Sequence, residues 1–267
     1  MPSSSAGLTD VTPVRPSDRG VALVTGAGRR IGRAIALDLA QAGFDIAVHH
    51  REPNGGGAID ARALIADIRN LGRRAEAVTA DLADEAAVRT LIPAAIRALG
   101  PLTLLVNNAS VFQDDRVGGL ERDLWDRHLE TNLRAPIVLA EAFAAQAPAG
   151  SSIINLLDQK VAKPDPRFFS YSLSRAGLWW ATRTLAQALA PDIRVNGVAP
   201  GPTLPSVHQT QADFDAEAAG TLLRKPGSPE AVARAVRWLV NAEMVTGQMI
   251  AVDGGQHLAW HTPDIVE

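Results

Sequence analysis

The chain of 267 residues carries a formal net charge of −3 and is 46% hydrophobic, which is enough for one sizeable core. The slightly acidic balance gives no basis for binding nucleic acid or an anionic membrane surface, and the lack of cysteine excludes disulfides and cysteine-ligated metals. Because no apolar run reaches membrane-spanning length and the amino terminus has no hydrophobic signal core, we expect a cytoplasmic protein without a metal site.

The alternation of apolar blocks with longer amphipathic stretches predicts the fold. Residues 1–18, rich in Ser, Pro and Thr, are expected to form a disordered tail that precedes a single domain over residues 19–267. Seven strands are predicted, over residues 21–24, 45–48, 75–79, 102–106, 153–157, 193–198 and 249–252. Helices are predicted near residues 30–42, 59–71, 85–99, 125–146, 171–189 and 229–241. Apolar strands separated by helices indicate the α/β class, with a single doubly wound parallel sheet of the Rossmann type and helices on both faces.

The first predicted strand leads into Thr-Gly-Ala-Gly-Arg-Arg-Ile-Gly at residues 25–32. Glycines between a strand and a helix let the backbone approach a pyrophosphate, whose charge suits the amide groups at the helix amino end. Ordinary strand-to-helix connections also contain glycines, but the flanking strand and helix favour a dinucleotide site here.

The end of the second predicted strand indicates which dinucleotide. A free ribose 2′-hydroxyl is usually bound by an acidic residue at this place, whereas a 2′-phosphate needs cationic donors. The chain has a His-His-Arg run at residues 49–51, and Arg29 or Arg30 can assist from the glycine turn, so we expect NADPH rather than NADH. Glu52 would repel a phosphate if it faced the ribose, and an orientation toward solvent is the alternative.

The stretch of residues 152–190 runs from an apolar strand through a polar loop into a long helix. Asp158 is the first charged residue beyond the strand's carboxyl end, where open α/β sheets bind their ligands. Tyr171 and Arg175 are four residues apart at the start of the helix, so the guanidinium lies within reach of the phenol. Since a fixed cation favours the phenolate, we expect a lowered pKa that lets Tyr171 act as a general acid. The alternative is a buried structural tyrosine near an exposed arginine.

Taken together, the motifs resemble those of the short-chain dehydrogenase/reductase family over about Val21 to Gly255. They comprise the glycine turn, Asp81 and Leu82 after the third strand, the Asn-Asn-Ala-Ser run at 107–110, Asn132, Tyr171 with a basic residue four positions later, Arg194-Val195-Asn196, and Pro200-Gly201. The resemblance implies an NADPH-dependent oxidoreductase. Its implied cofactor site consists of Gly26, Arg29, Arg30, Ile31, Gly32, His50, Arg51, Asp81, Leu82, Asn108, Ala109, Ser110, Tyr171, Arg175, Pro200 and Gly201.

Within that family, the details resemble the pteridine reductases and the related bacterial dihydromonapterin reductases. Arg30 matches their variant glycine turn, and residues 108–112 match their Asn-Ala-Ser-x-Phe stretch. Asp158 is the sharper mark, because most relatives have a serine thirteen residues before the tyrosine, whereas pteridine reductases have an aspartate. The His50-Arg51 pair also resembles their phosphate-binding strand end.

The resemblance also implies roles in substrate binding and catalysis. Phe112 would stack on a pterin ring opposite the nicotinamide, and Ser110 and Arg30 would also contact the ligands. The implied catalytic residues are Tyr171, Asp158, Arg175 and Asn132, with Asp158 and Tyr171 delivering the proton and Asn132 supporting the relay. The alternatives are structural: core packing for Phe112, a loop cap for Ser110, and a helix or turn cap for Asp158.

Arg175 stands where the family has a lysine that binds the nicotinamide ribose, lowers the tyrosine pKa and passes protons to a water chain. Arginine keeps the charge and the donors but cannot deprotonate in a relay. Three functions therefore stay open: reduction of a C=N bond in a reduced pterin, reduction of a carbonyl such as a 3-oxoacyl chain or sugar, and NADPH binding with little catalysis. Carbonyl reduction needs neither Phe112 nor Asp158, so these two residues favour the pterin.

Residues 202–225 follow the sixth strand, where this fold usually has a mobile substrate lid, and they leave the substrate's side chain unspecified. His208 is expected to be solvated. Trp179 and Trp180 face different directions on one helix, so one is expected in the core and the other at a subunit contact. Because relatives are commonly tetramers or dimers, we expect a homo-oligomer, with a tetramer favoured, and a small-molecule substrate.

Overall fold

The predicted strands pair side by side in one parallel sheet in the computed structural model, which describes residues 19–52, 54–206 and 209–260. The predicted tail of residues 1–18 lies outside these residues. The strands are β1 Val21–Val24, β2 Asp45–His50, β3 Ala75–Thr79, β4 Leu102–Asn107, β5 Ser151–Leu156, β6 Ile193–Pro200 and β7 Met249–Val252. Their order is β3-β2-β1-β4-β5-β6-β7, with every neighbouring pair parallel, so the predicted doubly wound fold is confirmed.

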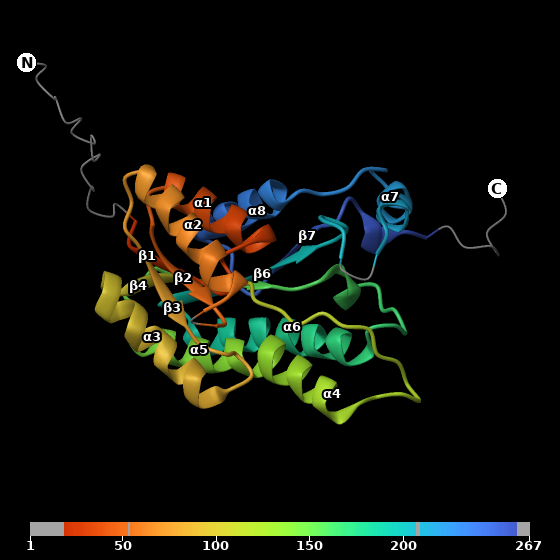
Figure 1. The fold of residues 1–267 in the computed structure, drawn as a ribbon, viewed down its shortest axis with the longest axis horizontal. Helices are drawn as coiled ribbons and strands as arrows, with labels where there is room; N and C mark the ends of the chain where they lie inside the picture. Colours follow the sequence, from red (N-terminus) through yellow and green to blue (C-terminus); the bar gives the residue numbers. More distant parts are fainter. Residues whose placement is uncertain (1–18, 53, 207–208, 261–267) are drawn as a thin grey trace, which may run out of the picture.

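Helices cover both faces of the sheet (Figure 1). The helices are α1 Arg30–Gln41, α2 Gly56–Asn70, α3 Glu85–Leu99, α4 Arg122–Leu129, α5 Ala135–Ala144, α6 Phe169–Leu189, α7 Gln211–Ala219 and α8 Pro229–Asn241. Helices α1, α2 and α8 pack on one face, and α3, α5 and α6 on the other. Among the residues described, no helix is both long and apolar enough to cross a membrane.

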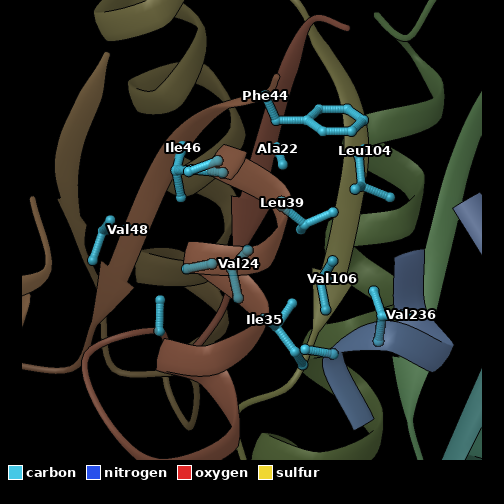
Figure 2. Close-up of a cluster of buried hydrophobic side chains, with 14 of the residues drawn as sticks. Ala22, Val24, Ile35, Leu39, Phe44, Ile46, Val48, Leu104, Val106 and Val236 are labelled. Atoms are coloured by element: carbon cyan, nitrogen blue, oxygen red, sulfur yellow. The ribbon is translucent and has the colours of Figure 1, made fainter. Parts of the chain in front are cut away.

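The core is built from the apolar stripes of these helices. Ile35 and Leu39 are one turn apart on α1, and both are fully buried together with Val236 of α8 (Figure 2). Every residue of β1 and β2 is buried, because helices cover the sheet on both sides. This is why β1 is a continuous apolar run rather than an alternating pattern.

The predicted helix over residues 125–146 is wrong as a single element. It consists of α4 and α5 joined by a π-helical segment, Glu130–Arg134. A π turn takes up an extra residue without changing which residue types favour a helix, so the apolar pattern does not reveal it. The segment lies beside the site and contains the buried Asn132.

A second difference is α7, which lies inside the region predicted as a lid. The helix begins with a capping box in which Thr210 and Asp213 bond to each other's backbone amides. Its buried residues are only Phe214 and Ala218, one turn apart. Such a narrow apolar stripe is too weak a periodic signal to predict a helix.

The strand order reverses between β1 and β4, and the loops that follow these two strands meet there. The Thr25 hydroxyl oxygen accepts hydrogen bonds from the backbone amides of Asn108 (2.9 Å) and Ala109 (3.0 Å). The Asn108 side-chain amide donates to the Thr25 carbonyl at 2.8 Å. In open α/β sheets, ligands bind at this kind of reversal, at the carboxyl ends of the strands.

A chain of buried polar side chains crosses the centre of the molecule. Asn107 Nδ2 donates to Asn155 Oδ1 at 2.9 Å, and Asn155 Nδ2 donates to Thr182 Oγ1 of α6 at 2.9 Å. All three side chains are buried. The chain therefore ties β4 and β5 to the helix that carries Tyr171.

Replacing Thr182 by Val removes the oxygen that accepts the Asn155 amide and keeps the side-chain shape. Because a buried donor is then left without a partner, we expect the free energy of unfolding to fall by about 1–3 kcal/mol. The control is Thr184→Val at an exposed position of the same helix, where a change within about 0.5 kcal/mol is expected. Urea denaturation followed by circular dichroism measures both, and equal losses in the two variants would contradict the role of the buried chain.

Candidate active site

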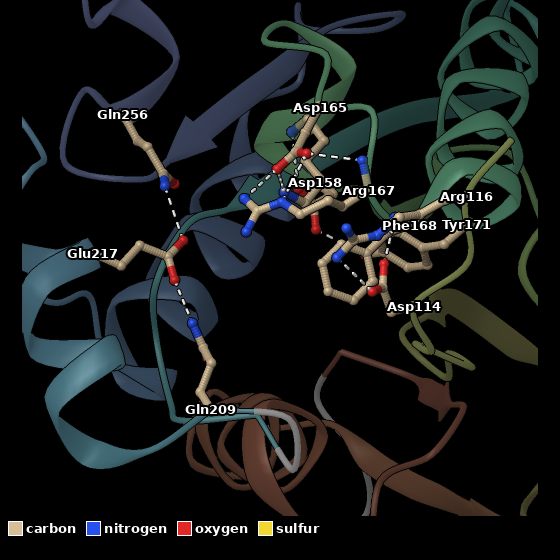
Figure 3. A network of polar contacts seen from close by, with 11 residues as sticks. Asp114, Arg116, Asp158, Asp165, Arg167, Phe168, Tyr171, Gln209, Glu217 and Gln256 are labelled. Atoms are coloured by element: carbon tan, nitrogen blue, oxygen red, sulfur yellow. Dashed lines mark hydrogen bonds and ion pairs between the residues drawn. The ribbon is translucent and has the colours of Figure 1, made fainter.

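The carboxyl ends of the strands open on a cavity of about 1030 Å³, lined by the loops after β1, β4, β5 and β6 and by α7. Figure 3 shows Asp158, Phe168 and Tyr171 on one side of this space and Glu217 of α7 on the other. The cavity therefore lies between the long helix α6 and the segment that follows β6, at the edge where the sequence places the site.

The glycine turn packs closely against the loop after β4. A Cβ atom at Gly32 would lie 2.3 Å from the Gly26 carbonyl oxygen and 2.6 Å from Asn108 Nδ2. Gly26 itself has φ +62°, in the left-handed region that favours glycine. Positions 26 and 32 therefore require glycine, and the backbone at the start of α1 stays open to a ligand.

His49 hydrogen-bonds to the glycine turn and carries no charge, which corrects the expectation that residues 49–51 form a cationic run. The imidazole lies inside β2, where its Nδ1 accepts the Gly26 amide at 3.0 Å and its Nε2 donates to the Ala80 carbonyl at 3.0 Å. Burial lowers the pKa of His49 to about 4. The ring is therefore neutral at pH 7 and joins the glycine turn to the end of β3.

The rest of the basic run is also paired within the chain. His50 is buried, with Nδ1 bonded to the Glu52 carbonyl at 2.6 Å and Nε2 to the Thr79 hydroxyl at 3.1 Å. Arg51 is exposed and donates two hydrogen bonds to the Glu52 carboxylate, at 2.6 and 3.1 Å. Of residues 49–51, only the Arg51 guanidinium is thus presented to solvent as a fixed cation.

Arg30 links the glycine turn to the segment after β6. Its backbone is left-handed, with φ 53°, and its guanidinium donates to the Pro205 carbonyl at 3.0 Å and, more weakly, to the Leu204 carbonyl at 3.4 Å. Arg29, at the first position of the same helix start, is exposed. The other predicted cofactor residues also end or follow strands or begin α1: Ile31, Asp81, Leu82, Ala109, Ser110, Pro200 and Gly201.

Tyr171 and Asp158 meet in the cavity wall, as their placement at a strand end and a helix start predicts. The Tyr171 hydroxyl donates to Asp158 Oδ2 at 2.8 Å, and Asp158 Oδ1 accepts the Lys160 backbone amide at 2.8 Å. The Arg175 guanidinium carbon lies 5.3 Å from the centre of the Tyr171 ring. The Asp158 carboxylate, just beyond the end of β5, is thereby held next to the Tyr171 phenol and the Arg175 guanidinium, which lie one turn apart on α6.

The predicted lowering of the Tyr171 pKa is wrong. Burial, reinforced by the neighbouring Asp158 carboxylate, raises the pKa of Tyr171 and outweighs the opposite effect of Arg175. Burial also raises the pKa of Asp158, against the hydrogen bonds from Lys160 and Tyr171. Asp158 is therefore the group whose pKa moves from the acidic range toward neutrality, while Tyr171 keeps its proton.

Arg175 is almost completely buried, with 3% of its surface exposed. Its Nη1 donates to the Leu156 carbonyl at 2.8 Å, but its Nε is buried with no hydrogen-bond partner. A buried donor without an acceptor is costly. Since Arg175 lines the cavity, this atom is suited to a ligand oxygen.

Asn132 fastens the loop after β4 through hydrogen bonds to the loop's backbone. Its side-chain amide donates to the Val111 carbonyl at 2.9 Å and to the Ser174 hydroxyl at 3.2 Å, and its carbonyl oxygen accepts the Val111 amide at 2.8 Å. The residue after Val111 is Phe112, so Asn132 fixes the backbone that carries the predicted stacking ring. This geometry is that of a positioning residue beside the Tyr171 helix.

A second buried network fastens the same loop to α6, and the sequence motifs give no sign of it. His128 Nδ1 bonds to the Ser170 hydroxyl at 2.7 Å, and that hydroxyl donates to Asp115. His128 Nε2 accepts the Gln113 amide at 3.3 Å, and the Ser170 amide donates to Asp115 at 3.0 Å. Local spacing could not reveal these partners, because they come from three separate segments.

Phe112 lines the cavity within an aromatic cluster. Its ring stacks on Phe168 with centroids 4.4 Å apart and an angle of 14°, and it meets Tyr171 edge-on with centroids 4.7 Å apart. Ser110, two residues earlier, is exposed and donates to the Val111 carbonyl at 3.1 Å. Phe168 was not predicted, although it lies in the loop between Asp158 and Tyr171, where a ligand-contacting residue is reasonable.

The opposite wall of the cavity is polar. Glu217 of α7 accepts hydrogen bonds from the amides of Gln209 (2.7 Å) and Gln256 (2.9 Å) (Figure 3). The lid prediction, over residues 202–225, covers Gln209 and Glu217 but not Gln256, which is distant in the sequence. His208, predicted to be solvated, lies outside the described residues.

Comparison with known proteins gives a consistent set of relatives. Residues 26–257 match the family model described as enoyl-(acyl carrier protein) reductase. The chain is 32% identical over 244 residues to the 3-oxoacyl-(acyl-carrier-protein) reductase FabG of Staphylococcus aureus strain Mu50, covering 89% of this chain and 98% of that protein. It is 34% identical over 250 residues to a short-chain type dehydrogenase/reductase of Picea abies, covering 88% and 92% of the two chains.

Solved structures add a more similar relative. FolM alternative dihydrofolate reductase 1 from Brucella canis, crystallised in complex with NADP, has a TM-score of 0.88 and 47% sequence identity to this chain. The match covers 94% of this chain and 98% of that one.

Replacing Asp158 by Asn tests the effect of burial on its charge. Desolvation disfavours the ionised form of Asp158 in the folded protein, so wild-type stability falls as the pH rises from the pKa of an unfolded aspartate, about 3.9, through the raised pKa of the folded protein. Asparagine has no such dependence. We therefore expect the difference in free energy of unfolding, variant minus wild type, to increase with pH, as measured by denaturation between pH 5 and 8.

Asp165→Asn is the matched control. A hydrogen bond from Arg167 keeps the pKa of Asp165 far below its ordinary range, so that this carboxylate stays ionised from pH 5 upward. The corresponding stability difference should be constant over the same pH range. A constant difference for Asp158→Asn as well would contradict the raised pKa.

Proposed function

The chain belongs to the short-chain dehydrogenase/reductase family of oxidoreductases, and we propose that it is an NADPH-dependent reductase that transfers hydride to a C=N bond of a reduced pterin. Dihydromonapterin, dihydrobiopterin and dihydrofolate represent the substrate class. The observation that carries this proposal is the partly buried Asp158, hydrogen-bonded to the Tyr171 hydroxyl next to the Phe112 ring. A carbonyl reductase of the family needs no carboxylic acid at that place.

The residues of the cavity suit NADPH. The glycine bend can take a pyrophosphate, and the unpartnered Nε of Arg175 can donate to a ribose hydroxyl of the nicotinamide half. Arg51 and Arg29 offer exposed cations for the 2′-phosphate. The NADP complex of the Brucella relative supports the same choice of cofactor. When bound, NADPH supplies the hydride.

The protein's own part in the reaction is to bind the ring and deliver a proton. Reduction of a C=N bond leaves negative charge on the ring nitrogen, which needs a proton from a positioned acid. Burial raises the pKa of Asp158, so its acid form is available closer to neutral pH. Tyr171 keeps its own proton and holds the Asp158 carboxyl group through its hydrogen bond, and solvent returns a proton to Asp158 after the transfer.

Arg175 takes the position of the family lysine, and its part in proton transfer differs from that of lysine. Its guanidinium lies against the Tyr171 ring and favours negative charge on Tyr171 and Asp158. Because arginine does not release its proton, it cannot pass protons as the family lysine does, and Asp158 supplies the proton instead. Asn132 contributes by holding the Phe112 loop.

Reduction of a carbonyl substrate is the second candidate, favoured by the 32% identity to a 3-oxoacyl reductase over nearly all of the chain. Phe112 and Asp158 argue for the pterin, because a 3-oxoacyl group has neither an aromatic ring to stack nor a ring nitrogen to protonate. The third alternative, a cofactor-binding protein with little catalysis, rests on Arg175 alone.

Self-association and location belong to the same proposal. Trp180 is 64% exposed on α6, whereas Trp179 packs partly buried against Leu178 and its neighbours. This is the division expected if one tryptophan lies in the core and the other at a subunit contact. We propose a homo-oligomer, with a tetramer favoured, in a reducing compartment such as the cytoplasm.

The proposal predicts NADPH oxidation by the purified protein with dihydropterins or dihydrofolate, followed at the absorbance of NADPH, and little with 3-oxoacyl or sugar carbonyls. We expect kcat to fall as the pH rises through the raised pKa of Asp158, because the acid form is then lost. Asp158→Asn and Tyr171→Phe should each lower kcat by about 10²-fold or more. Arg175→Lys serves as the companion variant.

Three outcomes separate the candidate functions. Turnover of carbonyl compounds in place of pterins would establish the second candidate. Tight NADPH binding without turnover until Arg175→Lys restores it would support the third. Pterin turnover that survives Asp158→Asn with an unchanged pH profile would contradict the role given to this carboxylate.

Gly32→Ala tests the cofactor site separately from catalysis. A Cβ atom there would collide with the Gly26 carbonyl and the Asn108 amide, so the bend must open and the phosphate-binding backbone must shift. We expect the Kd for NADPH, measured by its fluorescence on binding, to rise at least about 10-fold. Gly57→Ala, with no atom near its Cβ position, is the control and should bind as the wild type does.

A further inference from the structure

Phe168 is held in an unfavourable backbone conformation at the entrance of α6. Its φ and ψ are 56° and 48°, in the left-handed region that residues with a Cβ atom avoid. Its amide donates to Asp114 at 3.1 Å, and its carbonyl accepts the Ser172 amide at 2.8 Å. Strained residues of this kind persist where their surroundings over-determine them, and they concentrate at functional sites.

The ring of Phe168 is held in the cavity wall by two contacts. It stacks nearly parallel on Phe112, with centroids 4.4 Å apart, and the Lys160 ammonium lies 5.5 Å from its centre. Stacked rings and a cation near a ring are both attractive arrangements. Phe112 in turn meets Tyr171 edge-on, so the three rings form one continuous cluster beside the acid.

Lys160 connects this cluster to the proton donor. Its backbone amide donates to Asp158 Oδ1 at 2.8 Å, and its ammonium pairs with Asp165 at 3.1 Å. The same residue therefore contacts both Asp158 and Phe168. Lys160 therefore couples the Asp158 carboxylate to the stacked rings: its backbone amide contacts the carboxylate, and its ammonium contacts Phe168.

We propose that Phe168, held by Lys160, is a positioning residue that sets the plane of Phe112 and thereby the angle at which the substrate ring meets Asp158. The inference rests on the proposed function, because it assigns Phe112 to a pterin ring. Phe112 lies on a loop, and a phenyl ring on a loop samples other rotamers unless a neighbour restrains it. Phe168 restrains it before the substrate arrives, which lowers the entropic cost of binding.

The test exploits the backbone strain. Phe168→Gly removes the ring and also places the one residue type that accepts φ 56° without strain, so loss of binding is separated from loss of folding. We expect the KM for the dihydropterin to rise about 3- to 10-fold. The Kd for NADPH should stay within about twofold of the wild type, and the melting temperature should not fall.

Arg224→Gly is the matched control. Arg224 also has a left-handed backbone, with φ 52°, so glycine relieves the same strain there. Its side chain does not line the cavity. It should leave the KM unchanged. Phe168→Tyr is the conservative variant, and it should keep the wild-type KM because its ring can stack in the same way.

Each further outcome is decisive. An unchanged KM in Phe168→Gly, with wild-type turnover of dihydropterins intact, overturns the role of Phe168 and leaves the proposed function standing. A KM that falls would also overturn it, since the ring would then compete with the substrate. A wild-type protein that reduces no dihydropterin overturns both proposals. A KM that rises equally in Arg224→Gly shows a general effect of glycine and rejects the inference.

Discussion

The hydrogen bond from the Tyr171 hydroxyl to Asp158 is the interaction on which the rest of the site depends. It joins the end of β5 to the first turn of α6, in a place where burial opposes the charged form of both groups. A buried carboxylate is tolerated only when donors or cations surround it. The Lys160 amide and the Arg175 guanidinium meet this requirement, so that a carboxyl group is tolerated at the edge of the sheet.

The start of α6 explains how this bond keeps its geometry. A helix begins with backbone amides that have no partner within the helix, and here the loop after β4 provides the acceptors. Phe168 donates to the Asp114 carboxylate, Phe169 to the Asp115 carbonyl and Ser170 to the Asp115 carboxylate. The loop that carries Phe112 is therefore part of the cap of the helix that carries Tyr171. The proposed stacking ring and the proposed proton donor are therefore held by the same set of hydrogen bonds.

The sequence predicts the features that depend on local pattern and misses those that depend on tertiary contacts. The sheet, the bend at Gly26 and the meeting of Asp158 with Tyr171 follow from apolar runs and from positions at strand ends. The direction of the Tyr171 pKa does not, because burial and the Asp158 charge outweigh the nearest cation. The roles of His128 and Phe168 are equally hidden, since their partners come from other segments.

The buried amides of Asn107 and Asn155 have a consequence for how the chain selects its own sheet. Strands that are apolar on both sides can slide past one another with little change in the area they bury, because they have no alternating pattern to define alignment. Asn107 and Asn155 are direct partners in the pairing of β4 with β5. A shift by one residue would separate the two amides in a dry environment, at a cost for each unpaired group. The hydrogen bond between the two amides therefore favours the native alignment over its near neighbours.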